Sequence, residues 1–193
     1  DINEKLLKRV SEIVNYALDA DMYVIINEHW SGGWWGMFGS QDQAVREKAM
    51  TLYTRLWEQV AEYFKDYSYR LILESGNEEL GSRLNDEIDG VAGTLTEDET
   101  YEVTNKINQK FVDVVRKTGG KNVDRFLLIA GYNTDIEKTV DDRFVMPEDT
   151  AQNKQLLSVH YYTPWTYAGD GTSKNEWGTK EEYKEQNDLF EKM

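Results

Sequence analysis

The sequence contains no cysteine, and only two of its 193 residues are proline. The absence of cysteine excludes a disulfide framework, a thiolate metal site and a cysteine nucleophile. No apolar run approaches the roughly 18 residues that are needed to cross a bilayer, so we expect no membrane-spanning helix. The first residues have the pattern of a charged amphipathic helix, so we expect no signal peptide at this end of the sequence.

Basic side chains are also scarce, because 22 Lys and Arg residues stand against 36 Asp and Glu residues and give a formal net charge of -14. Nucleic acids and anionic membranes both require a basic face, so this charge argues against either as a partner. A neutral ligand fits better. The apolar share of 39 % and the aromatic share of 12 % are sufficient for a folded core, and the length fits one domain spanning residues 1–193.

Apolar residues recur at helical spacing in several long segments. Capping-box patterns, in which a Ser or Thr precedes a Glu or Gln by three residues, indicate where three of the helices begin. The predicted helices cover residues 4–18, residues 45–64 behind a capping box at Ser40, a segment from Thr96 to a stop at Gly119, and a segment that begins at Thr179.

Four short apolar runs alternate with these helices and are typical of β-strands. They lie in the segments MYVIINEHW, RLILESG, RFLLIAG and LLSVHYY. Strands that are apolar throughout and separated by long helices indicate an α/β fold with a parallel sheet whose outer face is covered. No Gly-rich phosphate loop follows any of these strands, which disfavours a nucleotide-binding fold.

Polar or aromatic side chains follow each predicted strand at its C-terminal end. They are Asn27, Glu28, His29 and Trp30 after the first strand, Asn77 and Glu78 after the second, Tyr132 and Asn133 after the third, and His160, Tyr161 and Tyr162 after the fourth. Each of these alone is most often a turn residue or a solvated group. Because the C-terminal ends of parallel strands lie on one rim, the four ends together predict a shared cleft.

Tryptophans accompany these strand ends. Flat aromatic faces stack on the C–H faces of pyranose rings, while amides, imidazoles and carboxylates bind the hydroxyl groups, so this combination points to a carbohydrate ligand. The predicted substrate-binding residues are Asn27, Trp30, Trp34, Trp35 and Trp165. Packing beneath loops is the alternative role for the tryptophans, and Trp57 is predicted to be core because it lies on a helix face.

Three motifs in this order resemble glycoside hydrolase family five, the cellulase-like (β/α)8 barrels. The segments YVIINEHW, LILESGNEE and LSVHYYTPW are similar to the third, fourth and sixth barrel strands of that family. The resemblance covers essentially the whole chain. It implies a partial TIM barrel, or half-barrel, in which about four parallel strands carry outer helices.

The resemblance further implies that the chain is a segment of a retaining endo-β-1,4-glucanase or related β-glycanase acting on cellulose-like polysaccharides. Glu78 would be the general acid/base, and the other catalytic residues would be Asn77, His29, His160 and Tyr162. One departure is Glu79, where the family usually has proline. A carboxylate close to Glu78 would raise the pKa of Glu78.

A second departure concerns the nucleophile of the retaining reaction, a carboxylate about 5 Å from the acid/base. The family carries it on the seventh strand, and no matching motif occurs in residues 1–193, so we expect the nucleophile to be missing from this chain. We expect no cofactor and no metal, because the two histidines stand alone on separate strands.

Four parallel strands that do not close leave two unpaired edges and an uncovered inner face. We therefore expect self-association or pairing with the missing barrel half. The alternative to an enzyme is a non-catalytic carbohydrate-binding half-barrel, which would bind a glycan through its tryptophans. The family resemblance also implies a secreted, extracellular and bacterial protein.

Overall fold

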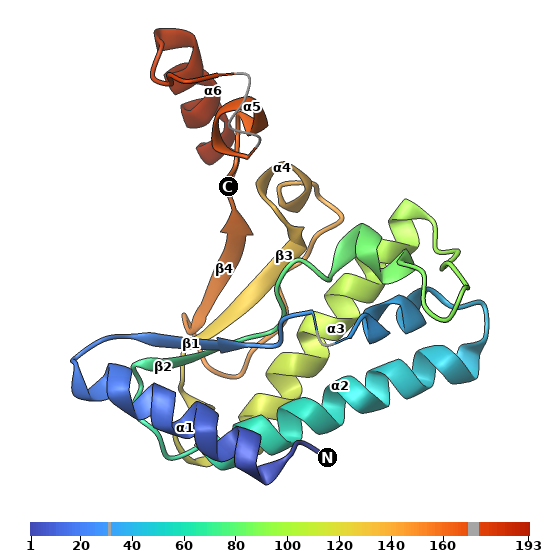
Figure 1. The fold of residues 1–193 in the computed structure, drawn as a ribbon, viewed down its shortest axis with the longest axis vertical. Helices are drawn as coiled ribbons and strands as arrows, with labels where there is room; N and C mark the ends of the chain where they lie inside the picture. Colours follow the sequence, from blue (N-terminus) through green and yellow to red (C-terminus); the bar gives the residue numbers. More distant parts are fainter. Residues whose placement is uncertain (31, 170–173) are drawn as a thin grey trace.

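The computed structural model describes residues 1–30, 32–169 and 174–193 (Figure 1). In this part of the chain four parallel strands form one sheet, in the order β1-β2-β3-β4. Their bounds are β1 Val24–Asn27, β2 Leu71–Glu74, β3 Leu127–Asp135 and β4 Gln155–His160. Each strand therefore lies beside the one that precedes it in the sequence, and all four C-terminal ends lie on the same edge of the sheet.

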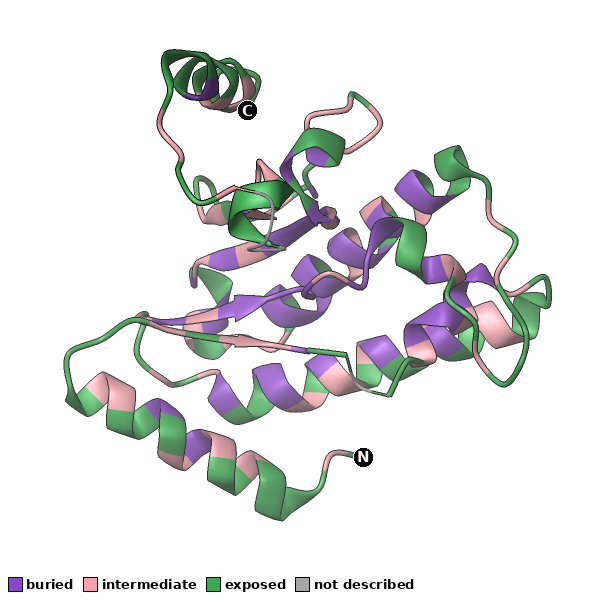
Figure 2. Cartoon of the chain, turned by 45° about the horizontal axis from the view of Figure 1, so that its top comes forward, coloured by how far each residue is buried: buried purple, intermediate pink, exposed green. Residues whose placement is uncertain are grey.

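Three long helices lie on one face of this sheet (Figures 1 and 2). They are α1 Glu4–Asp19, α2 Gln43–Phe64 and α3 Glu97–Lys117. The shorter helices are η1 Trp34–Gly39, η2 Gly81–Asn85, η3 Gly120–Val123, α4 Ile136–Thr139, α5 Trp165–Ala168 and α6 Lys180–Phe190. Helices α5 and α6 follow β4 and project away from the body of the molecule (Figure 1).

The predicted strands and long helices are confirmed, with one correction at a helix start. The capping boxes at Thr96 and Thr179 are both present. The capping box predicted at Ser40 is wrong, because η1 continues to Gly39 and Ser40 only closes it. Asp42 caps α2 instead, since its carboxylate accepts a hydrogen bond from the backbone N–H of Ala44 at 2.8 Å.

The core lies between the sheet and the long helices, and the buried residues of both layers face this space (Figure 2). Trp57 of α2 packs edge to face on Phe111 of α3, with ring centroids 4.6 Å apart. Leu73 and Ile129 of the sheet are fully buried in the same cluster. The prediction that Trp57 belongs to the core is confirmed.

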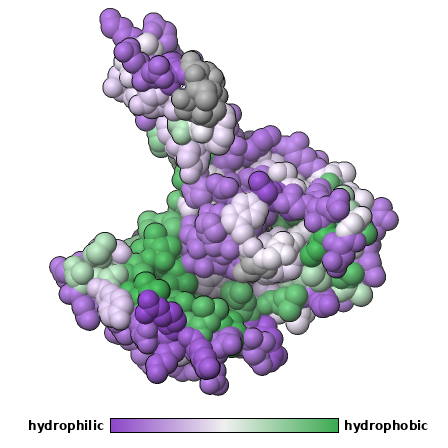
Figure 3. Space-filling view, in the orientation of Figure 1, coloured by the Kyte–Doolittle hydropathy of each residue, from purple (hydrophilic) through white to green (hydrophobic). Residues whose placement is uncertain are grey.

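The other face of the sheet is open, and apolar side chains lie on it. Ile25 of β1 and Leu156 of β4 are 53 % and 43 % exposed. Ile25 is paired with Ile72 of β2, so these two side chains lie on the same face. Figure 3 shows hydrophobic surface gathered in this region. The molecule is a half-barrel, with helices outside and an open inner face.

A buried arginine braces the end of the sheet opposite the strand C-termini. Arg125 is fully buried just before β3, and its side chain donates to the carbonyl oxygens of Phe64, Tyr67, Ser68 and Leu71. Its Nε donates to Asn122 Oδ1 at 2.7 Å. Burial lowers the pKa of Arg125 to about 10. This side chain ties the end of α2 and the start of β2 to β3.

We expect Arg125→Met to destabilise the fold by about 3 kcal/mol or more, because each buried carbonyl left without a donor costs about 1–3 kcal/mol. Urea denaturation followed by circular dichroism measures the free energy of unfolding. The matched control is Arg55→Met, whose side chain is exposed and pairs with Asp1, and which should cost less than about 1 kcal/mol. Equal losses in the two variants would contradict the bracing role.

Candidate active site

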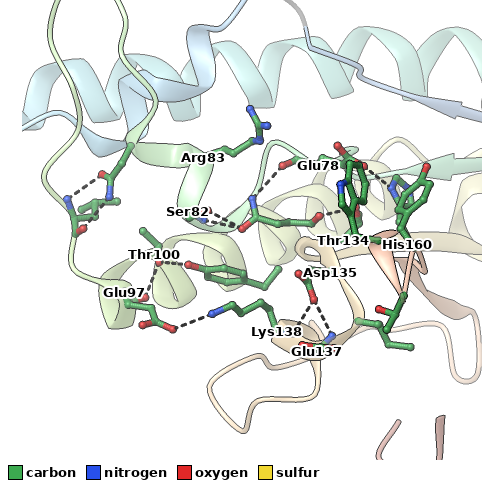
Figure 4. Close-up of a pocket in the computed structure, with 18 residues that line it drawn as sticks. Glu78, Ser82, Arg83, Glu97, Thr100, Thr134, Asp135, Glu137, Lys138 and His160 are labelled. Atoms are coloured by element: carbon green, nitrogen blue, oxygen red, sulfur yellow. Dashed lines mark hydrogen bonds and ion pairs between the residues drawn. The ribbon is translucent and has the colours of Figure 1, made fainter. Parts of the chain in front are cut away.

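The C-terminal ends of β2, β3 and β4 surround a cavity of about 790 Å³ (Figure 4). Glu78 follows β2, His160 ends β4, and Tyr162 and Trp165 follow β4. Further lining residues come from η2, the end of β3 and α4, among them Ser82, Arg83, Asn133, Asp135 and Lys138. The parallel sheet therefore brings predicted site residues from two distant segments into one cavity.

Glu78 and His160 form a direct contact in this cavity. Nδ1 of His160 lies 2.8 Å from Oε1 of Glu78, although the two residues are 82 positions apart in the sequence. The side chain of His160 is 32 % exposed and that of Glu78 is 36 % exposed. A carboxyl group that is hydrogen-bonded to an imidazole and is still open to solvent is able to exchange a proton with a bound ligand.

An aromatic row leads away from this pair. Tyr162 packs edge to face on His160, with ring centroids 6.3 Å apart, and Trp165 packs in the same way on Tyr162 at 6.0 Å. Tyr162 is 51 % exposed and Trp165 is 62 % exposed. These two side chains present apolar ring surface next to an acidic and hydrogen-bonding centre.

Asn77 and Trp30 lie beside Glu78 and hold each other in place. With the amide of the buried Asn77 oriented so that its oxygen faces two donors, this oxygen accepts from the indole N–H of Trp30 at 3.2 Å and from the backbone N–H of Glu78 at 3.1 Å. The guanidinium of Arg83 lies 4.4 Å from the centroid of the Trp30 ring. The Trp30 ring is therefore fixed between the loops that follow β1 and β2.

Asn27 is bound to a buried carboxylate on the inner face of the sheet. Its Nδ2 donates to Oε2 of Glu74 at 2.8 Å, and Oε1 of Glu74 accepts from the hydroxyl of Ser158 at 2.6 Å. Glu74 thus connects β1, β2 and β4 below the cavity. No site role was predicted for Glu74, although an acidic residue that ends an apolar strand is a recognisable signal.

The remaining sequence-predicted residues lie apart from the cavity. His29 is exposed and is not among the described residues that line it. Trp35 is only 2 % exposed, and its indole N–H donates to the buried Glu28 at 2.8 Å. The expectation of an exposed stacking face at Trp35 is therefore not met. Trp34 stacks on Trp35 with ring centroids 4.7 Å apart and is partly buried.

Glu79 is directed to backbone groups and not to the carboxyl of Glu78. Its carboxylate accepts from the backbone N–H of Trp30 and, at 2.7 Å, from the backbone N–H of Asn77. It is 1 % exposed, and this burial raises the pKa of Glu79, while the backbone hydrogen bonds act in the opposite direction. The partner of the Glu78 carboxyl is His160.

Asn133 supports the loop that carries Glu78. Its Oδ1 accepts from the backbone N–H and the hydroxyl of Ser82, at 3.1 and 2.9 Å, and its Nδ2 donates to the carbonyl oxygen of Glu78 at 3.2 Å. Asn133 was predicted to lie at a strand end without a specific role, and no motif marks Ser82. Only the fold shows that the two residues meet.

In the described ranges, no three His, Asp or Glu side chains are grouped so that they could hold a metal ion. Within the same residues, every helix is too short or too polar to cross a membrane.

The family model of the cellulases, glycosyl hydrolase family 5, matches residues 1–192. The chain belongs to glycoside hydrolase family 5. Among curated relatives, an endoglucanase A of Paenibacillus barcinonensis is 36 % identical over 193 residues, which cover 92 % of this chain and 45 % of the relative. A xyloglucan-specific endo-β-1,4-glucanase of Bacteroides ovatus is 39 % identical over 180 residues, which cover 92 % of this chain and 34 % of the relative.

Solved family 5 structures match the whole chain. A lichenase from a Caldicellulosiruptor species in complex with cellotetraose superposes with a TM-score of 0.82 at 32 % identity. A broad-specificity endoglucanase from Ruminococcus champanellensis with bound cellotriose gives 0.80 at 30 % identity. Each match covers 100 % of this chain and 53 % of the other. The chain thus spans about half the length of the structures, and less than half of the two curated relatives.

Replacing Glu79 by glutamine tests the raised pKa of its carboxyl. A carboxyl with a higher pKa in the folded chain binds more protons when folded, so its contribution to stability is largest at acid pH and declines as pH rises through the unfolded pKa of about 4.3 towards the folded pKa. Glutamine does not titrate. We therefore expect the stability of the native chain relative to Glu79→Gln to fall as pH rises above about 4.

Urea denaturation at several pH values measures this difference. The control is Glu102→Gln, at an exposed position of α3, which should show no such trend. If the free energy of unfolding of the native chain, minus that of Glu79→Gln, grew with pH over this range, the result would contradict the burial of an ionisable Glu79.

Proposed function

We propose that residues 1–193 form one partial catalytic domain, the acid/base half of a retaining endo-β-1,4-glucanase that cleaves β-glucans. The observation that carries this proposal is the contact between Glu78 and His160, at 2.8 Å, in a cavity open to solvent. The named activities of the relatives, including endoglucanase, lichenase and xyloglucan-specific glucanase, support a β-glucan as the substrate class.

In this proposal Glu78 protonates the glycosidic oxygen as the bond breaks and later takes a proton from the attacking water. His160 orients the Glu78 carboxyl through its Nδ1. Asn77 and Trp30 bind the sugar next to the scissile bond, and Tyr162 and Trp165 supply ring surface for stacking on pyranose faces.

We assign the nucleophile to a part of the barrel outside residues 1–193. Retaining hydrolysis requires it about 5 Å from the acid/base. Three other carboxylates line the cavity, namely Glu97, Asp135 and Glu137, and the first two already have structural partners. Asp135 caps α4 by accepting from the backbone N–H groups of Glu137 and Lys138. Glu97 forms an ion pair with Arg143 at 3.0 Å.

We further propose that the open inner face pairs with the missing barrel half or with a second copy of the chain. The exposure of Ile25 and Leu156 supports this, because apolar surface gains free energy when it is removed from water. An extracellular site of action belongs to the same proposal, since a polymer substrate of this class is met outside the cell.

A half-barrel that only binds glycan is the second candidate. The exposure of Tyr162 and Trp165 favours it, because exposed rings can bind a glycan whether or not a nucleophile is present. Calorimetry with a cello-oligosaccharide, run beside a reducing-sugar assay on the 193-residue chain, separates the two candidates. Binding without release of reducing ends favours the binding module.

We expect Glu78→Gln to lower turnover of an unactivated β-glucan by about 10²–10⁴-fold, because glutamine cannot donate the proton that the leaving oxygen requires. The assay uses a protein that joins this chain to the nucleophile-bearing part of the barrel. Glu102→Gln is the control and should leave turnover unchanged. Full activity of Glu78→Gln on the polymer, with an unchanged circular dichroism spectrum, would exclude Glu78 as the acid/base.

We expect the 193-residue chain to self-associate at micromolar concentration, because its inner face exposes apolar side chains. Sedimentation velocity at several concentrations measures the mass. Ile25→Lys should shift the chain towards monomer, whereas a charge change at the exposed Glu58 of α2 should not. A stable, folded monomer at all these concentrations would contradict self-association.

A further inference from the structure

We propose that Glu79 is a positioning residue that fixes the Trp30 ring and the Asn77–Glu78 segment for the sugar chain. This inference rests on the proposed function, because it concerns how the same cleft is held in shape. It adds a role that the catalytic assignment does not contain, since Glu79 itself does not reach the cavity.

The first observation is that one buried carboxylate joins two loops. Oε1 of Glu79 accepts from the backbone N–H of Trp30, and Oε2 accepts from the backbone N–H of Asn77 at 2.7 Å. Trp30 follows β1 and lies 49 positions before Glu79 in the sequence. Both oxygens are therefore used, one for each of the two loops that carry the predicted sugar-binding side chains.

The second observation is the backbone of Trp30, which has a φ of +55°. A bulky residue rarely adopts this left-handed conformation, which costs about 1–2 kcal/mol and persists only where the surroundings fix it. Three contacts fix it here: the backbone N–H is held by Glu79, the indole N–H by Asn77 and the ring face by Arg83. Because Trp30 keeps 37 % of its surface exposed, the fixed ring remains open to a ligand.

The third observation is that a charged group is an unfavourable choice for packing alone. Burial raises the pKa of Glu79, and the buried Glu28 lies close enough to raise it further. The hydroxyl-bearing ring of Tyr53 is fully buried near both carboxylates. A carboxylate nevertheless provides two acceptors in one plane, and the two backbone N–H groups require two acceptors.

Glutamine is therefore a discriminating replacement for Glu79. It has nearly the same shape, but it offers only one acceptor oxygen and turns an NH2 group towards the second N–H. We expect Glu79→Gln to release one of the two loops while the helices and the sheet stay folded. The expected consequence is a displaced Trp30 ring and weaker sugar binding.

A double-mutant cycle tests whether Glu79 acts through Trp30. Calorimetry measures the affinity of the 193-residue chain for cellotetraose in the native protein, Glu79→Gln, Trp30→Phe and the double variant. We expect Glu79→Gln to weaken binding about tenfold in the native background and at most about threefold in the Trp30→Phe background, because coupled residues are not additive. Glu102→Gln is the matched control and should bind as the native chain does.

A general loss of stability would lower affinity by the same factor in both backgrounds, and that result would overturn the proposal. Unchanged affinity in Glu79→Gln would also overturn it. If Glu79→Gln does not fold, as judged by circular dichroism, Glu79→Asp takes its place in the same cycle, since aspartate keeps the charge but is too short to reach both N–H groups.

A second measurement separates this inference from the proposed function. The indole N–H resonance of Trp30, assigned by its loss in Trp30→Phe, should shift in Glu79→Gln without any ligand and should stay in place in Glu102→Gln. If the native chain does not bind cellotetraose but the resonance shifts in Glu79→Gln, the proposed glycan binding is wrong and the positioning of Trp30 by Glu79 is supported. A resonance that does not move in Glu79→Gln overturns the positioning role.

Discussion

The parallel pairing of four consecutive strands is the constraint on which the site depends. Because β3 pairs with both β2 and β4 in parallel, the chain leaves β2 and β4 on the same edge of the sheet. Glu78 and His160 then meet at 2.8 Å across the end of β3. A single antiparallel strand in this series would send one of the two side chains to the opposite edge.

Around this contact, polar side chains hold the loops and strand ends through hydrogen bonds to backbone groups and, in one case, to another side chain. Asn133 holds the Glu78 carbonyl, Glu79 holds the N–H groups of Asn77 and Trp30, and Glu74 holds Asn27 from below. Hydrogen bonds are directional, so they fix the orientation of a loop as well as its position. The site is thus a set of loops whose backbone is bound to the strand ends and to one another.

The fold was predictable because it depends on periodic patterns. The four apolar runs form the strands, the amphipathic segments form the long helices, and the capping boxes at Thr96 and Thr179 are present, since each of these features depends on neighbours in the sequence. The convergence of the strand ends followed from parallel topology. The family assignment, which the comparisons confirm, rested on three short motifs in the right order.

The individual directions of side chains were not predictable. Trp35 is one residue from Trp34 in η1, yet it is buried against Glu28, and the sequence does not show which of two adjacent rings turns inward. Whether Glu79 faced Glu78 or the backbone depended on the path of the loop after β1. Ser82 carries no motif, and its bond to Asn133 exists only because η2 lies against β3.

The open face of the sheet has a direction. Near the start of the strands this face is apolar and carries Ile25, Ile72 and Leu156. Near the ends of the strands it is polar and carries the hydrogen-bonded side chains of Asn27, Glu74 and Ser158. Any structure that covers this face must therefore bring hydrocarbon to one end and polar groups to the other. A covering structure in the reverse orientation would place hydrocarbon against the Glu74 carboxylate, which is unfavourable. The half-barrel therefore selects the orientation of the structure that covers it.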